Sequence, residues 1–377
     1  MSSHPPRPAG RLTTIKDVAL QAQVSVTTVS HVVNNTRFVS EGARQRVLQA
    51  IDELRYVPSA LARSLKSNRT HTVGMMIPNS SNPYFAEIIR GIEDTCYAAG
   101  FNVILCNSDD DPLKQSTYVR LLSEKQVDGL IVMSSGADGE LLDTLRAASM
   151  PQVVVDREID DLEADLVEVN HEAGGAIATR HLLALGHRRI ACIAGPQTLS
   201  SARQRVQGYR LALQEAGIGV DERLLRSADF TSAGGHLAMA SLLDDAQRGG
   251  DGRPTAVFAS NDLMAIGAVC AAAGAGLRIP QDLSVIGFDD IALSAYANPP
   301  LTTVAQPKHR TGELAAQMLM QRIAERERAW QREILQPTLT VRQSTGPVSS
   351  EGSAGPPQVS LTPAGGGLGA ARPWGRS

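Results

Sequence analysis

The sequence has few aromatic residues, few cysteines and no long apolar run. Aromatic residues make up 4% of the 377 residues, and the four cysteines form no CxxC pair. Structural zinc sites and disulfide frameworks both need grouped cysteines, so we expect four buried free thiols in a reducing compartment. The apolar runs fall short of the roughly 18 residues that a membrane-spanning helix needs. Residues 1–10 lack the apolar core of a secretory signal, and we therefore expect a cytoplasmic protein with no membrane partner.

The charge is distributed unevenly along the chain, although the net charge is only −3. Residues 1–71 hold ten lysines and arginines against four aspartates and glutamates, whereas residues 72–377 hold 26 against 35. A small basic front on a large acidic body favours contact of the front with a polyanion. Because basic surfaces are common, this argument depends on a motif within the basic part.

Composition divides the chain into five segments. Residues 1–12 form a Pro-rich arm that we expect to be disordered, residues 13–57 have a helical pattern, and residues 58–71 form a short basic linker. From Val73 onward, short Val- and Ile-rich runs alternate with amphipathic stretches, which predicts parallel sheets built from βαβ units. Residues 345–377 are rich in Gly, Pro and Ser, and we expect a disordered tail there.

Three short helices are predicted within residues 13–57. Thr14 opens the first with Asp17 as its capping-box partner, Ser25 caps the second, and the third follows Ser40. Apolar residues recur at helical spacing on one face of each helix. The inward set is expected to be Ile15, Val18, Ala19, Ala22, Val29, Val32, Val33, Val47, Leu48, Ile51 and Leu54. Two short helices joined by a tight turn and braced by a third form a helix-turn-helix unit.

The exposed face of the second helix carries small polar groups. Val26, Thr27, Ser30 and His31 can reach base edges in a DNA major groove without clashing. A small helical bundle with a solvated Ser/Thr face explains the same pattern equally well. The basic charge of the front is what favours the DNA interpretation.

The linker contains a second candidate DNA element. Pro58 suits the first turn of a helix that continues to Lys66, although a helix of about nine residues is marginal in water. Leu65 stands between Arg63 and Lys66, and an apolar wedge flanked by cations is typical of minor-groove intercalation. Considered alone, an ordinary linker is the simpler interpretation of this segment.

Taken together, these motifs resemble a known family. The segments TIKDVALQAQVSVTTVSHVVNNTRFVS and YVPSALARSLK, followed by the α/β body, resemble the LacI family of bacterial transcriptional repressors over residues 13–344. Within this family they resemble the ribose and purine repressors, and the ribose operon type most closely. The resemblance implies an N-terminal all-α helix-turn-helix plus an α/β, two-lobed effector domain like that of periplasmic binding proteins. It also implies that residues 72–344 bind the effector and dimerise, with lobe 1 at about 72–163 and 295–322 and lobe 2 at about 164–294 and 323–344.

The resemblance further implies which residues contact DNA. The implied set is Thr14, Ser25, Val26, Thr27, Thr28, His31, Leu65 and Lys66. Thr14 and Ser25 would contact phosphates, and the other residues of the helix-turn-helix would lie at or next to the major groove. Leu65 would wedge into the central minor-groove step beside Lys66, in a hinge that orders only when the dimer holds a pseudo-palindromic operator.

Polar stretches follow the predicted strands of the body, where ligands of α/β proteins bind. These stretches are NSSNPYF (79–85), DRE (156–158), SSARQR (200–205), ADF (228–230), SND (260–262), FDD (288–290) and AQP (305–307). Carboxylates and amides can hydrogen-bond vicinal hydroxyls while aromatic rings cover apolar ring faces, so this set of residue types is typical of a sugar site.

Several of these residues also have a purely structural interpretation. Asn261 or Asp262 could cap a helix, Asp156 and Arg157 could form an ion pair, and Phe288 could belong to the core. The recurrence of such residues after several strand ends is what favours a binding site.

Resemblance to ribose repressors and ribose-binding proteins names the effector contacts. They are expected to be Asn82, Tyr84, Phe85, Asp156, Arg157, Arg205, Phe230, Asn261, Phe288, Asp289 and Gln306. Tyr84 and Phe288 would supply ring faces. Met133 stands where the binding proteins place an amide, which puts the identity of the sugar in doubt. The pattern of purine repressors fits less well, because Leu199 replaces an arginine and Arg157 replaces a tryptophan.

The sequence carries no signature of an enzyme. It has no Walker loop, no GxSxG, no HExxH and no metal-ligand spacing of histidines, so we expect neither a cofactor nor a metal. Asp289 and Asp290 are adjacent at a strand end and would point in opposite directions. A sugar-transport binding protein is the rival interpretation, and the DNA-binding front argues against it.

We therefore expect a homodimeric, DNA-binding transcriptional repressor of a sugar-utilisation operon. By resemblance, a sugar such as ribose would release it from its operator. A purine or another sugar that acts as a corepressor is the alternative.

Overall fold

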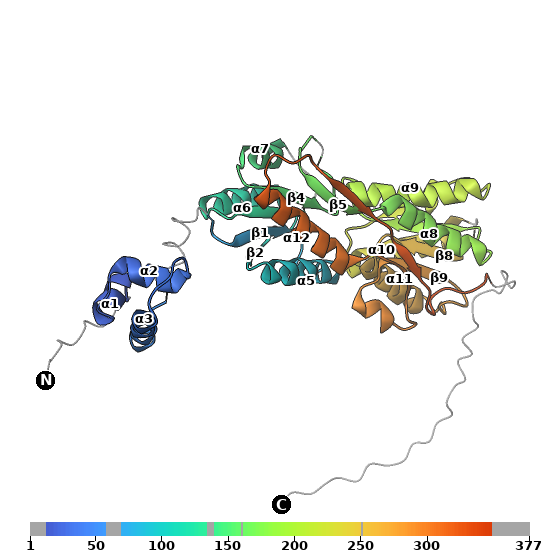
Figure 1. Cartoon of the computed structure of the whole chain (residues 1–377). Helices are drawn as coiled ribbons and strands as arrows, with labels where there is room; N and C mark the ends of the chain where they lie inside the picture. Colours follow the sequence, from blue (N-terminus) through green and yellow to red (C-terminus); the bar gives the residue numbers. More distant parts are fainter. Residues whose placement is uncertain (1–12, 58–68, 134–138, 160, 250–251, 349–377) are drawn as a thin grey trace, which may run out of the picture.

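The computed structural model describes residues 13–57, 69–133, 139–159, 161–249 and 252–348 (Figure 1). The predicted arm, residues 58–68 of the linker and the tail from residue 349 lie outside these ranges. The described part contains a helical amino-terminal unit and two six-stranded sheets covered by helices. The predicted fold class is thus confirmed.

The amino-terminal unit consists of α1 (Ile15–Gln21), α2 (Val26–Asn34) and α3 (Glu41–Glu53). The predicted capping box is present, because the Thr14 amide donates to Asp17 Oδ2 at 2.8 Å and the Asp17 amide donates to Thr14 Oγ1 at 3.4 Å. The predicted inward residues form one cluster except for Leu48, which is 51% exposed. Val47 takes the inward position, and Leu48 follows about 100° further around the helix, so it points to solvent.

The first sheet has the strand order β11-β5-β4-β3-β1-β2, and all its neighbours are parallel. Its strands are β1 (Thr72–Ile77), β2 (Asn102–Asn107), β3 (Gly129–Val132), β4 (Gln152–Val155), β5 (Asp165–Val169) and β11 (Arg332–Leu335). One face packs on α5 (Pro83–Ala98) and α12 (Lys308–Ala324), and the other on α6 (Pro112–Glu124) and α7 (Gly139–Ala147). Burial of both faces explains the nearly continuous apolar strands.

The second sheet has the order β12-β10-β9-β8-β6-β7, in which only β12 runs antiparallel to its neighbour within the described residues. Its strands are β6 (Ile190–Ala194), β7 (Leu225–Ser227), β8 (Ala256–Ala259), β9 (Ser284–Asp289), β10 (Thr302–Ala305) and β12 (Thr338–Thr340). α8 (His171–Ala184) and α9 (Ser200–Glu215) cover one face, and α10 (Ser232–Gly249) and α11 (Asp262–Gly274) cover the other. The short 3-10 helices η1 (Glu222–Leu224) and η2 (Ala292–Ala295) lie in connections.

The lobe boundaries differ from those expected. The chain passes from one lobe to the other three times, between β5 and α8, between β10 and α12, and between β11 and β12. We expected the changes near residues 163, 294 and 322, but β5 and β11 belong to the first sheet and β10 to the second. The bounds near residues 163 and 322 were misplaced because β5 and β11 were not recognised as strands.

Two smaller expectations also need correction. Cys96, Cys106 and Cys192 are buried as predicted, but Cys270 is exposed. Residues 345–348 of the predicted tail are part of the second lobe, where the Gly346 carbonyl lies 3.0 Å from His187 Nε2.

Among the described residues, no helix has the length and apolar character that crossing a bilayer requires.

The strand β5 contains a charged residue, Asp165, because a buried ion pair neutralises it. Asp165 is fully buried in β5, and Arg322 at the end of α12 contacts both of its carboxylate oxygens at 3.0 Å. Arg328 donates to Asp165 Oδ2 at 2.6 Å, and the Gln331 amide donates to Oδ1 at 2.9 Å. The carboxylate therefore holds the loop between α12 and β11 against the sheet, and its partners come from more than 150 residues away.

Removal of one partner from this pair should destabilise the protein strongly. Arg322→Ala leaves the Asp165 carboxylate buried beside fewer cations, and we expect a loss of about 3–5 kcal/mol in unfolding free energy measured with urea. The matched control is Arg180→Ala, which breaks an exposed pair with Glu215 and should cost less than about 1 kcal/mol. Equal effects of the two variants would contradict the role assigned to Arg322.

Candidate functional site

The second helix of the amino-terminal unit presents its first turn to solvent. Ser25 Oγ accepts from the Thr28 amide at 3.0 Å, which is the predicted helix cap, and it also hydrogen-bonds Thr28 Oγ1 at 2.8 Å. Val26 is 41% exposed and Thr27 is exposed. His31 is half-buried, and its Nδ1 lies 2.8 Å from Thr36 Oγ1. Capping by Ser25 thus leaves Val26 and Thr27 free to face a ligand.

The turn between α1 and α2 is held by a side chain of the third helix. Arg46 of α3 donates from Nε to the Ala22 carbonyl at 3.2 Å, and Gln23 in the turn has a φ of 52°. The helical unit as a whole has little net positive charge, since residues 13–57 hold only one more basic than acidic side chain. Most of the basic excess belongs to the arm and the linker, where Leu65 and Lys66 fall outside the described residues.

The end of the linker is anchored to the first lobe by one carboxylate. Asp128 accepts the Thr70 amide through Oδ1 at 2.8 Å and the His71 amide through Oδ2 at 2.7 Å. Thr70 Oγ1 adds a bond to the Gln126 carbonyl at 3.0 Å, just before β3. A carboxylate that accepts two adjacent backbone amides holds the chain in one orientation. The linker therefore enters the lobe at a fixed point.

The predicted effector residues come together between the carboxyl ends of the two sheets. A cavity of about 20 Å³ lies there, lined by Asn82, Tyr84, Phe85, Asp156, Arg157, Ser201, Arg205, Phe230, Asn261 and Asp289. Phe288 and Gln306 do not line it but lie directly behind, in contact with Arg205 and Asp289. About 20 Å³ has room for one water molecule, so a larger ligand requires the two lobes to part.

A chain of polar contacts joins the two acidic groups of the cleft. Tyr84 donates its hydroxyl to Asp156 Oδ1 at 2.6 Å, and the Tyr84 hydroxyl oxygen also lies 3.2 Å from Gln306 Oε1. Gln306 donates through Nε2 to Asp289 Oδ1 at 2.7 Å. Asp156 follows β4 of the first sheet, and Asp289 ends β9 of the second. The chain thus spans the cleft.

The central cation of the cleft is Arg205. Its guanidinium stacks on the Phe288 ring at 3.9 Å, donates to the Ser260 carbonyl at 2.5 Å and lies 3.5 Å from Asp289 Oδ1. α8 approaches its backbone closely, because a Cβ on Gly175 would stand 2.1 Å from the Arg205 carbonyl oxygen. The pairing of α8 with α9 therefore sets where this guanidinium lies.

The environments of the two carboxylates push their pKa values apart. Burial raises the pKa of Asp289 to about 7, although the nearby Arg205 cation opposes the shift. Burial acts on Asp156 in the same way, but the hydrogen bond from His171 and the cations Arg157 and Arg205 outweigh it and hold its pKa below the usual range. Asp156 is therefore ionised at neutral pH, whereas Asp289 titrates there.

Several site residues also have the structural roles that the sequence left open. Asn82 caps α5 through the Tyr84 amide, and Asn261 caps α11 through the Met264 amide at 2.9 Å. Asn261 also donates to the Phe230 carbonyl at 3.0 Å. The predicted contact between Asp156 and Arg157 is present at 3.5 Å. Capping and ligand binding are compatible, because each amide retains further hydrogen-bonding capacity.

Three residues of the cleft have a strained backbone. Asp156, Phe230 and Asp289 have φ values of 71°, 65° and 111°, which non-glycine residues rarely adopt. The Phe230 ring lies where a Cβ on Gly195 would stand, at 2.2 Å. Such strain costs about 1–3 kcal/mol per residue and persists where the surrounding structure enforces it. Here it places two carboxylates and one ring at the cavity.

Two further residues at the cleft, His171 and Ser201, were not among the predicted effector contacts, although Ser201 lies in the candidate stretch 200–205. His171 begins α8 directly after β5, and its ring lies between Asp156, at 3.6 Å, and Arg205, at 3.3 Å. Burial and the Arg205 cation lower the pKa of His171, so it is neutral at pH 7. Recognition of DLVEV as a strand would have identified it, because the residue after a strand is where cleft ligands lie.

Comparison with known proteins identifies the two parts of the chain. Residues 14–59 match the family described as bacterial regulatory proteins, lacI family, and residues 179–345 match a periplasmic binding protein-like domain. An HTH-type transcriptional repressor PurR from Photobacterium profundum is 44% identical over 340 residues, which cover 88% of this chain and 98% of that protein.

Solved structures resemble the chain over both parts. The lac repressor dimer bound to operator and an anti-inducer gives a TM-score of 0.81 at 29% identity, over 89% of this chain and all of that one. A LacI-family regulator from Enterococcus faecium with bound ribose gives 0.66 at 34% identity, over 74% of this chain and all of that one.

The relatives are transcriptional repressors, which confirms the prediction that the protein is not an enzyme. The chain belongs to the LacI family of bacterial transcriptional regulators and is a DNA-binding repressor.

Proposed function

We propose that this repressor binds a pseudo-palindromic operator as a homodimer and changes its operator affinity when a small effector enters the cleft between its lobes. The observation that supports this most directly is the buried network of Asp156, Arg205 and Asp289, which joins groups from both sheets around one cavity. A ligand that replaces these contacts changes how the lobes sit, and linkage requires a reciprocal effect on DNA.

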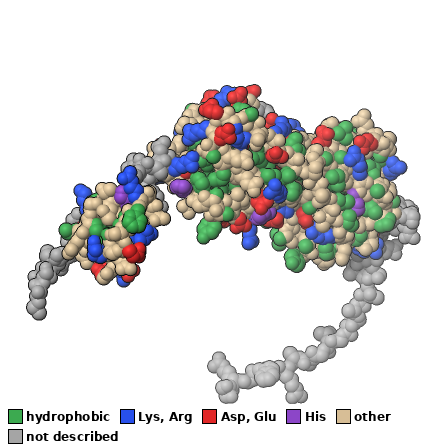
Figure 2. All heavy atoms as spheres, viewed as in Figure 1, with side chains coloured by type: hydrophobic (Ala, Val, Ile, Leu, Met, Phe, Trp, Pro, Cys, Tyr) green, Lys and Arg blue, Asp and Glu red, His purple; other side chains and the backbone are tan. Residues whose placement is uncertain are grey.

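Exposed apolar side chains on the first lobe offer a surface for the second copy. Ile104 and Leu105 lie exposed on the edge strand β2, and Leu113 and Leu121 lie exposed on the neighbouring α6. Figure 2 shows hydrophobic side chains on the surface in this part of the body. Grouped apolar side chains are unusual on a monomer and favour an interface. We propose this edge for dimerisation.

DNA reading is assigned to α2, with Val26, Thr27, Thr28 and His31 toward the bases and Thr14 and Ser25 toward phosphates. The support is the exposure of the first turn of α2 and the fixed turn before it. Since residues 13–57 are nearly neutral, cations of the arm and the linker supply most of the attraction to phosphate. Leu65 and Lys66 keep their assignment to the minor groove as part of this proposal.

Substitution of Thr27 should change which operator is preferred. Selection from a randomised duplex library should give a palindromic motif for the parent protein, and Thr27→Asn should change the preferred base at one position per half-site by about tenfold. The control is Gln49→Ala, on the exposed side of α3, which should leave the motif unchanged. A uniform loss of affinity for all sequences would mean that Thr27 contacts only phosphate, and failure to select any motif would refute the proposal.

The anchor at Asp128 is proposed to pass movement of the first lobe to the linker. β1 begins immediately after the anchored residues Thr70 and His71. The other end of the same sheet carries Asp156 in the cleft. A rigid lobe that moves at one end must therefore move the linker at the other.

Loss of the anchor should separate effector binding from DNA binding. Asp128→Asn presents an N–H group to one of two backbone amides, so the linker should lose its fixed entry. We expect effector affinity in calorimetry to stay within about twofold, while the effector-induced change in operator affinity falls at least severalfold. Asp143→Asn on α7 is the control. An unchanged response to effector in Asp128→Asn would contradict the anchor.

The effector class has two candidates. The name PurR of relatives at 41–45% identity favours a purine, and the rings of Tyr84, Phe85 and Phe230 at the cavity suit a planar base. A pentose is the second candidate, because Arg157 and Leu199 depart from the purine-repressor pattern and because the Enterococcus faecium regulator binds ribose. We propose a purine first. Whether the effector strengthens or weakens operator binding is part of the same test.

Thermal shift with purine bases and with ribose distinguishes the two candidates, because bound ligand raises the melting temperature by mass action. Asp289→Asn should abolish the shift by the true effector and leave operator binding without effector intact. An effector that shifts both proteins equally would exclude Asp289 from the site.

The same variant tests the titration of Asp289. The folded protein retains this proton up to about pH 7, whereas the unfolded chain releases it near pH 4. Ionisation therefore destabilises the ligand-free fold as pH rises from about 4 through 7. We expect Asp289→Asn to gain melting temperature relative to the parent over this range, with the difference growing as pH rises.

A further inference from the structure

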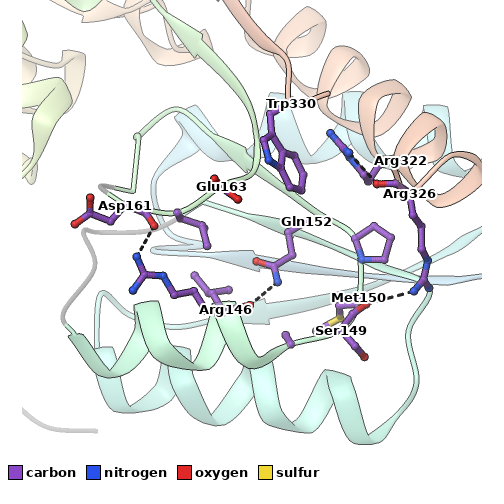
Figure 3. A pocket seen from close by; sticks show the side chains of 13 residues that line it. Arg146, Ser149, Met150, Gln152, Asp161, Glu163, Arg322, Arg326 and Trp330 are labelled. Atoms are coloured by element: carbon purple, nitrogen blue, oxygen red, sulfur yellow. Dashed lines mark hydrogen bonds between the residues drawn. The ribbon is translucent and has the colours of Figure 1, made fainter. Parts of the chain in front are cut away.

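A second cavity lies near the amino-terminal end of β4, whereas the cleft lies at the carboxyl ends of the strands (Figure 3). It has a volume of about 490 Å³ and is lined by the end of α7, the start of β4, residues 161–163, the end of α12 and Trp330. Small-molecule sites in proteins measure roughly 300–1,000 Å³. The cavity is therefore large enough for a small ligand without any movement of the lobes, unlike the cleft.

One wall of the cavity contains an unpaired acceptor. Gln152 donates through Nε2 to the Leu145 carbonyl at 2.7 Å, while its Oε1 is buried and has no hydrogen-bond partner among the described residues. Figure 3 shows this side chain in the middle of the cavity, between Trp330 and Arg146. A buried carbonyl oxygen without a donor is unfavourable. Because this oxygen is shielded from solvent, the N–H or O–H group of a ligand would satisfy it after the terminal amide of Gln152 rotates toward the cavity.

The opposite wall is formed by the ring of Trp330, which Arg322 holds in place. Arg322 stacks its guanidinium on the Trp330 ring at 3.9 Å and is itself fixed by Asp165. The indole remains 49% exposed and lines the cavity. A ring that is held in one orientation stacks on a planar ligand with little loss of side-chain freedom.

One end of the cavity carries a cation that no carboxylate neutralises. Arg326 is exposed, its guanidinium donates to the Ser149 carbonyl at 3.5 Å, and the described residues provide no ion pair for it. Arg146 at the other end donates to the Asp161 carbonyl at 2.6 Å, and the Glu163 carboxylate lies on that side. A guanidinium at one end suits an anion there, and Glu163 disfavours a second anion at the other.

We propose that this cavity binds a planar aromatic ligand that carries one anionic group and one N–H donor. The ring lies against Trp330, the donor reaches Gln152 Oε1, and the anion pairs with Arg326. Gln152 begins β4, and Asp156 follows the same strand at the cleft, about 13 Å away at the rise of an extended chain. The ligand therefore occupies a site separate from that of the effector.

Three simple probes share the aromatic ring and test the anion and the donor separately. Para-aminobenzoate has the ring, the anion and the donor, benzoate lacks the donor, and aniline lacks the anion. We expect saturable binding of para-aminobenzoate to the full-length protein by calorimetry, and binding at least about tenfold weaker for the other two. Quenching of Trp330 fluorescence in a Trp374→Phe background, which removes the other of the two tryptophans, should follow the same curve.

Substitutions in the lining of this cavity test whether para-aminobenzoate binds there. Arg326→Ala should weaken para-aminobenzoate by about tenfold or more, and Arg326→Lys should restore part of this loss. Gln152→Ala should bring para-aminobenzoate to the affinity of benzoate, with an unchanged melting temperature as the check on folding. Arg248→Ala in the second lobe is the matched control and should have no effect.

Three results would overturn the proposal. They are the absence of saturable binding by para-aminobenzoate, equal affinity for all three probes, and loss of binding in Asp289→Asn, which would place the probe in the cleft. Retention of binding in Asp289→Asn together with loss in Arg326→Ala supports a second site.

Discussion

The feature on which the closed cleft most depends is the chain of polar contacts from Asp156 through Tyr84 and Gln306 to Asp289. It joins the carboxyl ends of two separate sheets and leaves a cavity of about 20 Å³ between them. Its two acids differ in state, because Asp156 is ionised while burial raises the pKa of Asp289 to about 7. Ile291, Leu263 and Ile266 of the second lobe also pack against the core of the first lobe. The closed lobes therefore rest on apolar contacts as well as on polar groups that a ligand can replace.

The rest of the first lobe is organised along its strands. Asp156 lies at one end of the sheet, and at the other end Asp128 holds the backbone amides of Thr70 and His71. Between them lie strands buried on both faces, and close-packed interiors transmit displacement with little compression. The effector cleft thus lies at the carboxyl ends of the strands, and the linker is anchored at their amino-terminal ends. Movement of the lobe can therefore link effector binding to DNA binding without any contact between the two sites.

Much of this could be predicted from the sequence, and the failures have physical causes. Local patterns sufficed for the helix-turn-helix, since caps such as Thr14 and Ser25 act within three residues. Most residues that line the cleft cavity could be predicted, because polar stretches after the strand ends and the resemblance to a known family both pointed to them. β5 was missed because Asp165 makes it look polar, and the arginines that neutralise it come from a distant part of the chain. His171 was lost with that strand, and the 490 Å³ cavity around Trp330 depends on the same distant pairing.

The three passages of the chain between the lobes have a consequence for dissecting the protein. Each lobe is assembled from stretches that are not contiguous, because α12 and β11 return to the first sheet after the second has been built. A single proteolytic nick cannot release either lobe as an intact fragment, and no simple truncation isolates one. Expression of one lobe alone would require an internal deletion that removes the other lobe and rejoins the pieces, and both lobes are expected to fold and to be degraded as a unit.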